Sequence, residues 1–421
     1  MKRKLVMMFT MLFLMVMATP VLASVNLNIN GNPFTPTAAP QLEEGITSVP
    51  VYVIARTLGA DVTVDNNQIV INENGNILKM TIGNCNATYN GQNKLMPKAA
   101  EIVNGEVMVP VRFITEIFDA SIDWQSKDQT VAVKYQEKRD GLLADEMLTK
   151  ASKAMEKYNT YKMKVNMDMS NQIEAEGQES QTMDMTNRME MAYQQQPLLM
   201  YIKQEISGLA GQDEEKIENI TSESLINKDG FYMTMPDQGW VKMEIPGMDI
   251  ATLMEQSGNQ NVVDYIQQMK DAGVVMSYAN DQVKDGKEYW VINVTMGPKT
   301  FQNFYQNMIK QIPALNADTT DTETSADFQN VMKDVLNNLQ ADMVYNLWID
   351  KETLLTKFMD LDAKINMSMK APDENQKITK VDMKMKEKAA YEIYDLGGSF
   401  TVPDVSGAMS MTEFMQKEQQ K

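Results

Sequence analysis

The sequence predicts an α+β protein, in which a small duplicated α+β module precedes a curved antiparallel half-barrel sheet with inserted helices. Three observations support this class. A segment that begins with Val49-Pro50-Val51 recurs from Val109-Pro110-Val111. A short charged linker over 136–142 is then followed by an amphipathic helix. Beyond that helix apolar and polar residues alternate, which is the period of a β-strand with one buried face.

The N-terminus has the pattern of a secretory signal peptide, which we assign to 1–23. Basic residues at 2–4 precede an apolar run over 5–18, and small residues lead to a cleavage site after Ala23. The run is too short for a stable membrane span. An uncleaved anchor is the alternative, and the cleavage site favours removal. We therefore expect a secreted, extracytoplasmic protein that is associated with the cell envelope.

Composition excludes several classes of function. The chain has 421 residues, enough for two or three domains, and a net charge of −18, which disfavours nucleic acid as a partner. It contains no histidine, so Ser-His-Asp and Cys-His catalytic pairs are excluded and zinc or copper sites are disfavoured. The one cysteine, Cys85, is expected to be a small buried strand residue, with a free reactive thiol as the alternative. We predict no cofactor, no metal and no catalytic residue.

Each copy of the repeat predicts the same order of elements. An extended X-Pro step leads into a short helix, then a small-residue stop, then two strands joined by a polar turn. Leu58-Gly59-Ala60 corresponds to Phe118-Asp119-Ala120 at the stop. Asn-Gly pairs at 74–75, 90–91 and 104–105 favour tight hairpins. Residues 25–135 therefore form one small module made of two related halves.

This region resembles the copper amine oxidase N-terminal-like domain, often called a stalk domain. The resemblance is carried by Val109-Pro110-Val111-Arg112-Phe113, Asp119-Ala120, Ile122-Asp123-Trp124 and Thr130-Val131-Ala132-Val133. Asp119 stands where the family has glycine. The resemblance implies an extracytoplasmic adhesion or spacer module, with a cell-wall polymer as its partner. It implies no oxidase activity, because the histidine copper ligands and the Asn-Tyr-Asp/Glu triplet are missing.

Residues 142–402 predict the half-barrel. A helix over 142–158 presents Leu143, Met147 and Ala151 on one stripe. Many alternating strands follow, with Asp285-Gly286 as one hairpin turn. Further elements are helices at 249–272, 299–312 and about 325–340, a polar loop over 316–327 and a polar tail over 403–421.

The same region resembles the lipoprotein-carrier half-barrel fold. The segments that carry the resemblance are "MLTKASKAMEKYNTYKMKVNMDM" (147–169), a helix leading into a strand, and "LWIDKETLLTKFMDL" (347–361), two strands around an Asp-Lys-x-Thr turn. The resemblance implies a secreted protein of carrier-like shape, and related secreted families have no assigned activity.

Methionine is unusually abundant, with 38 residues, and its flexible thioether suits a surface that accepts varied apolar guests. Ten methionines would share one side of the half-barrel and bind an acyl chain or a lipidated partner. They are Met163, Met167, Met183, Met185, Met189, Met191, Met367, Met369, Met383 and Met385. One alternative is that methionine replaces leucine in a filled core, which the excess in the signal peptide and tail favours. Copper(I) binding is a further alternative.

Carboxylates give no clear catalytic pair. Asp360 and Asp362 share a strand face and are interpreted as solvated residues. The sequence thus predicts a non-enzymatic cell-envelope protein with an attachment module and a half-barrel that binds a lipid or another apolar ligand. The alternatives are a carboxylate-dependent cell-wall hydrolase and a purely structural surface protein. An open apolar face, a cleft with two converging carboxylates, or a packed face would distinguish them.

Overall fold

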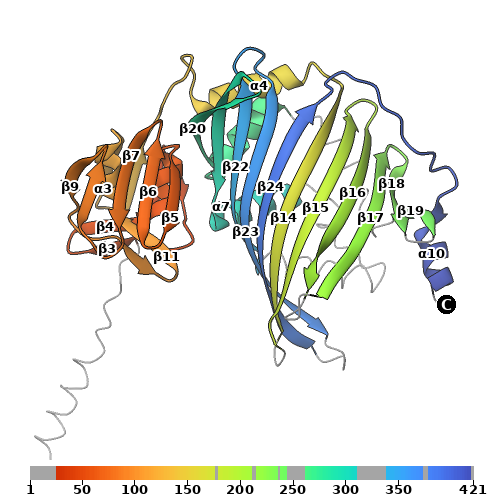
Figure 1. The fold of residues 1–421 in the computed structure, drawn as a ribbon, viewed down its shortest axis with the longest axis horizontal. Helices are drawn as coiled ribbons and strands as arrows, with labels where there is room; N and C mark the ends of the chain where they lie inside the picture. Colours follow the sequence, from red (N-terminus) through yellow and green to blue (C-terminus); the bar gives the residue numbers. More distant parts are fainter. Residues whose placement is uncertain are drawn as a thin grey trace, which may run out of the picture.

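The structure is a computed structural model that describes residues 25–175, 179–210, 215–235, 238–243, 261–310, 338–372 and 378–418. The signal peptide, the polar loop over 316–327 and most of the helix expected at about 325–340 lie outside these residues. So does the first part, 249–260, of another expected helix. Figure 1 shows small sheets at the N-terminal end followed by one large curled sheet.

Residues 25–135, here called the N-terminal module, form three small sheets and two short helices. The sheets have the strand orders β12-β13-β1-β2, β10-β11-β4-β3 and β5-β6-β7-β8-β9. The elements are β1 (Asn26–Ile29), β2 (Asn32–Phe34), β3 (Gln41–Glu43), β4 (Ile46–Pro50), α2 (Val51–Thr57), β5 (Asp61–Asp65), β6 (Gln68–Glu73), β7 (Asn76–Thr81), β8 (Asn86–Tyr89), β9 (Gln92–Leu95), β10 (Glu101–Val103), β11 (Glu106–Pro110), α3 (Val111–Ile117), β12 (Ser121–Gln125) and β13 (Thr130–Lys134).

The two related segments contain elements of the same kind in the same order. In each, a strand ends at a proline, and the proline is the N-cap of a seven-residue helix. Gly59 and Asp119 then adopt positive φ angles of 67° and 54°, which turn the chain into the next strand. The Asn-Gly pairs occupy tight turns with both residues at positive φ.

The large sheet has twelve strands in the order β20-β21-β22-β23-β24-β14-β15-β16-β17-β18-β19-β25. Every neighbouring pair is antiparallel except β19 and β25. The elements are α4 (Ala144–Met155), β14 (Thr160–Ala175), β15 (Gln181–Gln194), β16 (Leu199–Ala210), β17 (Glu215–Asn227), β18 (Gly230–Met235), β19 (Gly239–Met243), α6 (Val262–Asp271), β20 (Val275–Lys284), β21 (Lys287–Met296), α7 (Pro298–Lys310), β22 (Gln340–Asp350), β23 (Thr356–Pro372), β24 (Ile378–Tyr394), β25 (Met409–Ser410) and α10 (Met411–Glu418). The protein therefore fits the α+β class, with a curled sheet as its main element.

Local sequence signals explain the turns and the tail of this sheet. Asp285 and Gly286, both at positive φ, connect β20 to β21 as predicted. The Asp-Lys-x-Thr segment connects β22 to β23, and Asp350 Oδ1 accepts backbone hydrogen bonds from Glu352 and Thr353 at 3.0 and 2.8 Å. The C-terminal segment, expected as a polar tail in which Met409 to Met415 could form one or two helical turns, adds β25 to the sheet edge at β19 and continues into α10.

Cys85 differs from its prediction. It precedes β8 rather than lying within a strand, and its side chain is half-buried. The reason is local, because the chain turns at Gly83 with φ of 80° and only then enters the strand. Ala87 takes the inward position of β8 and is buried.

The N-terminal module packs against edge strand β20 and the adjoining strands. Ser277 Oγ donates a hydrogen bond to the backbone oxygen of Arg56 at 2.7 Å, and Arg56 forms an ion pair with Asp342 at 3.4 Å. Asn280 Nδ2 donates to Asp61 Oδ2 at 2.6 Å. Val275 belongs to the apolar cluster of the module. These contacts join the module and the large sheet.

Glycines allow the backbones to meet at this interface. A Cβ on Gly59 would lie 1.5 Å from the carbonyl oxygen of Tyr278. On the sheet side, a Cβ on Gly273 would lie 2.7 Å from the carbonyl oxygen of Pro33, and one on Gly297 would lie 2.9 Å from that of Thr35. Real Cβ atoms do not approach so closely, so each contact requires glycine.

Candidate functional site

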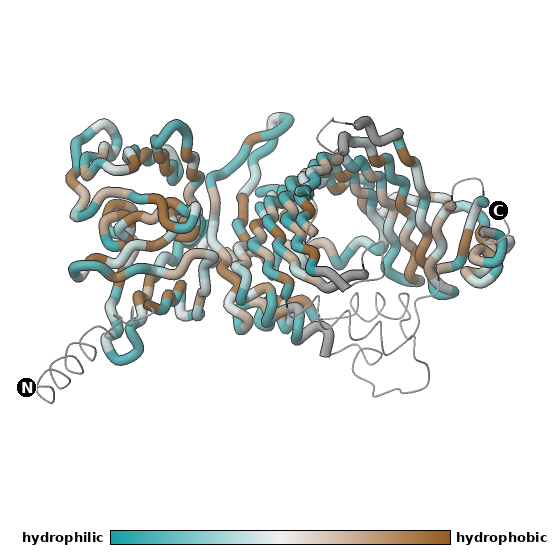
Figure 2. Tube along the Cα trace, turned by 90° about the horizontal axis from the view of Figure 1, so that it is seen from below, coloured by the Kyte–Doolittle hydropathy of each residue, from teal (hydrophilic) through white to brown (hydrophobic). Residues whose placement is uncertain are grey.

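The strand register gives the large sheet one apolar and one polar face. Met163 is paired with Met191 on β15 and Ile393 on β24, and Met167 is paired with Ala389. Lys164 and Glu190, which pair across the same strands, point to the other side. Figure 2 shows strands of alternating hydropathy that curl around a common axis. We call the two sides the apolar face and the polar face.

Three helices pack on the apolar face at the β20–β22 end and leave a cavity of about 430 Å³. This volume lies within the usual range for small-molecule pockets. Helix side chains meet strand side chains around it, and Ser152 with the hydroxyls of two tyrosines are its side-chain polar atoms. The lining is Leu148, Ser152, Val262, Tyr265, Ile266, Met269, Val294, Met296, Phe301, Phe304, Met343, Tyr345, Leu347 and Met359.

The ten methionines singled out in the sequence all lie on the apolar face, and all are half-buried. The register divides them into two groups along the strands. The first group, nearer the start of β14, is Met163, Met167, Met189 and Met191. The second group, towards the β14–β15 and β23–β24 turns, is Met183, Met185, Met367, Met369, Met383 and Met385. None of the ten lines the cavity.

Four other methionines line the cavity, namely Met269, Met296, Met343 and Met359. Sequence reasoning missed them because none of the four has another methionine within four positions, unlike each of the ten. The cavity and the first methionine group are nevertheless continuous. Met343 and Tyr345 line the cavity and also pack against the cluster that contains Met163, Met167 and Met189.

Polar side chains interrupt the apolar face beside the cavity. Burial raises the pKa of Glu387 on β24, and burial followed by the charge of Glu387 raises the pKa of Tyr391. Burial, with smaller effects of Tyr391, Glu387 and Tyr265, raises the pKa of Tyr345 to about 12. The tyrosines are therefore neutral hydrogen-bonding groups at physiological pH.

Glu387 should make stability depend on pH. Because its folded-state pKa lies above the ordinary 4.5, the folded state binds the proton more tightly than the unfolded state. Stability from this group is thus complete at low pH and falls as pH rises through the raised pKa. We expect Glu387→Gln to melt about 2 °C above the wild type at pH 7 but with almost no gain at pH 4, by circular dichroism.

Glu190→Gln is the matched control, because Glu190 is exposed on the polar face. It should leave the melting temperature almost unchanged at both pH values. An equal gain for Glu387→Gln at pH 4 and pH 7 would show that removal of the charge is not responsible.

Asp360 corrects the interpretation of the two strand carboxylates as solvated. Asp362 is exposed, but Asp360 is half-buried and accepts a hydrogen bond from Trp348 Nε1 at 2.9 Å. Burial raises the pKa of Asp360, while Trp348 and Lys284 oppose that rise. Trp348 also contacts Phe358, with ring centroids 5.6 Å apart. The polar face therefore has an aromatic cluster here, which the sequence pattern did not indicate.

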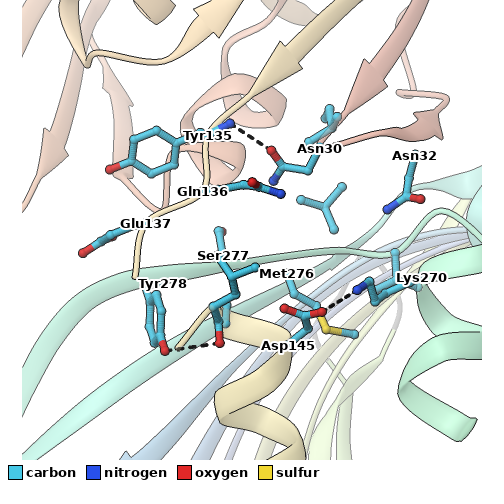
Figure 3. Close-up of a pocket in the computed structure, with 15 residues that line it drawn as sticks. Asn30, Asn32, Tyr135, Gln136, Glu137, Asp145, Lys270, Met276, Ser277 and Tyr278 are labelled. Carbon is cyan, nitrogen blue, oxygen red and sulfur yellow. Dashed lines mark hydrogen bonds and ion pairs between the residues drawn. The ribbon is translucent and has the colours of Figure 1, made fainter. Parts of the chain in front are cut away.

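A second cavity, of about 90 Å³, lies between the N-terminal module and the large sheet. Figure 3 shows polar groups around it, including the ion pair of Lys270 with Asp145 and the Tyr278 hydroxyl that donates to the backbone oxygen of Leu143 at 3.4 Å. Asn30 Oδ1 accepts from the backbone N–H of Tyr135 at 2.8 Å. The cavity is too small for a lipid chain, and its polar contacts hold the interface together.

Two family models match the sequence. The copper amine oxidase N-terminal domain matches residues 28–133, which confirms the resemblance seen there. A family of unknown function, DUF6612, matches residues 143–406. The chain belongs to the DUF6612 family. The DUF6612 region contains the large sheet, the apolar face and the cavity. No curated protein matches the sequence.

Solved structures similar to this DUF6612 protein include lipoprotein LppX from Mycobacterium tuberculosis, with 9% identity, 62% of this chain and 98% of that chain covered, and a TM-score of 0.29. LprF from Mycobacterium bovis is 12% identical, with 62% of this chain and 96% of that chain covered and a TM-score of 0.28. A LolA superfamily protein from Nitrosomonas europaea is 8% identical, with 62% of this chain and 96% of that chain covered and a TM-score of 0.18. These names agree in kind with the second resemblance, but the TM-scores are too low to support an inference. Among the described residues, no helix combines the length and apolar character that a membrane crossing needs.

Proposed function

We propose that this protein is a secreted, non-enzymatic cell-envelope protein that binds a lipid or another apolar ligand in its DUF6612 region. The observation that carries the proposal is the cavity of about 430 Å³, whose lining is almost entirely apolar and aromatic. A folded protein normally fills such a space with side chains, because an unfilled apolar cavity costs stability. An acyl chain, free or on a lipidated protein, would occupy it.

We further propose that the chain consists of a signal peptide over 1–23, an attachment or spacer module over 25–135, the ligand-binding region over 142–402 and a C-terminal tail. The module has its own surface hollow of about 430 Å³, where Trp124 lies with Arg112 and Asp123. An aromatic ring flanked by charged groups suits a polar polymer, which supports a cell-wall polymer as its partner.

Ligand binding is tested by blocking the cavity. We expect the wild type, gently extracted from its native host, to carry lipid that native mass spectrometry detects. We expect Met343→Trp, which puts a larger ring into the cavity lining, to lose most of that lipid while it remains folded. Met415→Trp is the control, because Met415 is 52% exposed on α10 and should not affect binding.

The result that would overturn the proposal is a wild type without lipid that also fails to take up the neutral fluorophore diphenylhexatriene. Equal lipid content in Met343→Trp and the wild type would mean that the lipid binds outside this cavity.

A further inference from the structure

Polar side chains from three adjacent strands form a belt across the apolar face. Asn187 on β15 pairs with Met167, Glu387 on β24 pairs with Met169, and Asn171 on β14 pairs with Met385. They lie at three successive inward positions along β14. We define the belt as Asn171, Asn187 and Glu387. It crosses the face diagonally, with Asn187 level with the first methionine group and Asn171 level with the second.

Two members of the belt have hydrogen-bond acceptors that nothing satisfies. Asn171 is 7% exposed and Asn187 is 8% exposed. The Oδ1 atom of each has no hydrogen-bond partner in the described part of the chain. Buried polar atoms are nearly always paired, because an unpaired one loses its hydrogen bonds to water without compensation. Two such oxygens on one apolar face therefore indicate a missing donor.

The belt lies next to the cavity. Glu387 pairs with Ala363 on β23, and Ala363 pairs with Met343 on β22, which lines the cavity. Two strand spacings separate Glu387 from Met343, which is about 10 Å. Asn171 on β14 and Asn187 on β15 lie one and two strands further, so a chain that starts in the cavity must extend past Glu387 to bring its head to these residues.

The charge of the belt selects among possible head groups. Among the described residues Glu387 forms no ion pair or hydrogen bond, and burial alone raises its pKa. Its carboxylate accepts hydrogen bonds and repels anions. All three members thus offer acceptors, and an anionic head such as a fatty-acid carboxylate would be disfavoured.

We propose that the belt binds the head of an amphiphilic lipid that carries O–H or N–H donors and no negative charge, while its acyl chain occupies the cavity. This inference rests on the proposed lipid-binding function and specifies the ligand class. Asn187 is level with position 167 of β14, so it lies four residues, or roughly 14 Å, from Asn171, and one head donates to one of these two amide oxygens at a time. Ligands with the same chain but without donors bind less tightly, because they make no hydrogen bond to either oxygen.

The test compares two probes with the same acyl chain. Monolaurin has two hydroxyl donors, and methyl laurate has none. Binding to the full chain is measured by displacement of diphenylhexatriene. The wild type should bind monolaurin about tenfold more tightly than methyl laurate, as expected for one hydrogen bond to an otherwise unpaired buried acceptor. The double variant Asn171→Leu/Asn187→Leu, which keeps side-chain size, should bind the two probes equally.

Each outcome has a distinct meaning. Equal affinity of the wild type for both probes, with diphenylhexatriene displaced, overturns the belt proposal and leaves lipid binding intact. Binding of neither probe overturns lipid binding itself. Persistence of the tenfold preference in the double variant also overturns the belt proposal. The single variant Met191→Leu, on the same face outside the belt, is the control and should keep the preference.

Discussion

Gly59→Asp should release the N-terminal module from the large sheet. Aspartate is the residue found at the corresponding position 119, where it tolerates a positive φ of 54°, so the turn itself can form. The added Cβ would, however, lie 1.5 Å from the carbonyl oxygen of Tyr278. Relieving that overlap should cost about 3 kcal/mol of docking free energy, or roughly a hundredfold in the docking equilibrium.

Trypsin cleavage after Arg139 measures this release. The Arg139 side chain is 11% exposed, and its guanidinium donates to the carbonyl oxygen of Ala279 on β20 at 2.8 Å and lies 4.8 Å from the ring centre of Tyr278. Undocking should expose the bond, so Gly59→Asp should be cut much faster than the wild type. Small-angle scattering should show a larger radius of gyration.

Gly91→Asp is the matched control, because Gly91 also has positive φ but open space around its Cβ position. It shares the backbone strain and lacks the overlap, and it should be cut at the wild-type rate. Equal cleavage of the Gly59 and Gly91 variants would mean that the contact at Tyr278 does not hold the interface.

Asp350→Ala should destabilise the β22–β23 connection by about 2 to 4 kcal/mol, measured as the free energy of unfolding in urea. Asp350 is 1% exposed and holds the backbone N–H groups of Glu352 and Thr353, with Lys287 Nζ 3.7 Å away. Burial alone would raise its pKa, but these hydrogen bonds and Lys287 outweigh burial and lower the pKa. Its contribution is therefore present above the ordinary pKa of 3.8 and is lost as pH falls.

Two controls make this prediction specific. Asp350→Asn retains one acceptor oxygen and should cost less than the alanine variant, and its difference from the wild type should shrink towards pH 3. Asp362→Ala, at an exposed position on neighbouring β23, should cost less than about 0.5 kcal/mol. A loss for Asp350→Ala as small as that for Asp362→Ala would contradict the structural role of the turn.

Features set by short-range pattern could be predicted from the sequence. Alternation along β14, β15, β23 and β24 was enough to place ten methionines on one face, because a strand sends successive side chains to opposite sides. Asn-Gly and Asp-Gly pairs marked hairpins for the same local reason. The family-specific residues from Val109 to Val133 identified the N-terminal module.

The cavity and the belt depend on packing between distant segments, so local pattern could not reveal them. The cavity is enclosed by side chains of α4, α6, α7 and strands β21 to β23, and nothing in Met269 or Met296 taken alone indicates it. Asn171 and Asn187 look like ordinary polar strand residues until the register places them inside. The glycine at position 59 likewise becomes informative only when Tyr278 is seen against it.

The arrangement at the two ends of the large sheet has a consequence for self-association. An uncovered border strand offers free amide and carbonyl groups onto which another copy can add, leading to polymers. At one border β20 faces the N-terminal module, and at the other β19 is joined by β25 with α10 beside it (Figure 1). The N-terminal module and the β25–α10 segment thus cover the two border strands and prevent strand addition there. Loss of either one should favour fibrous aggregates.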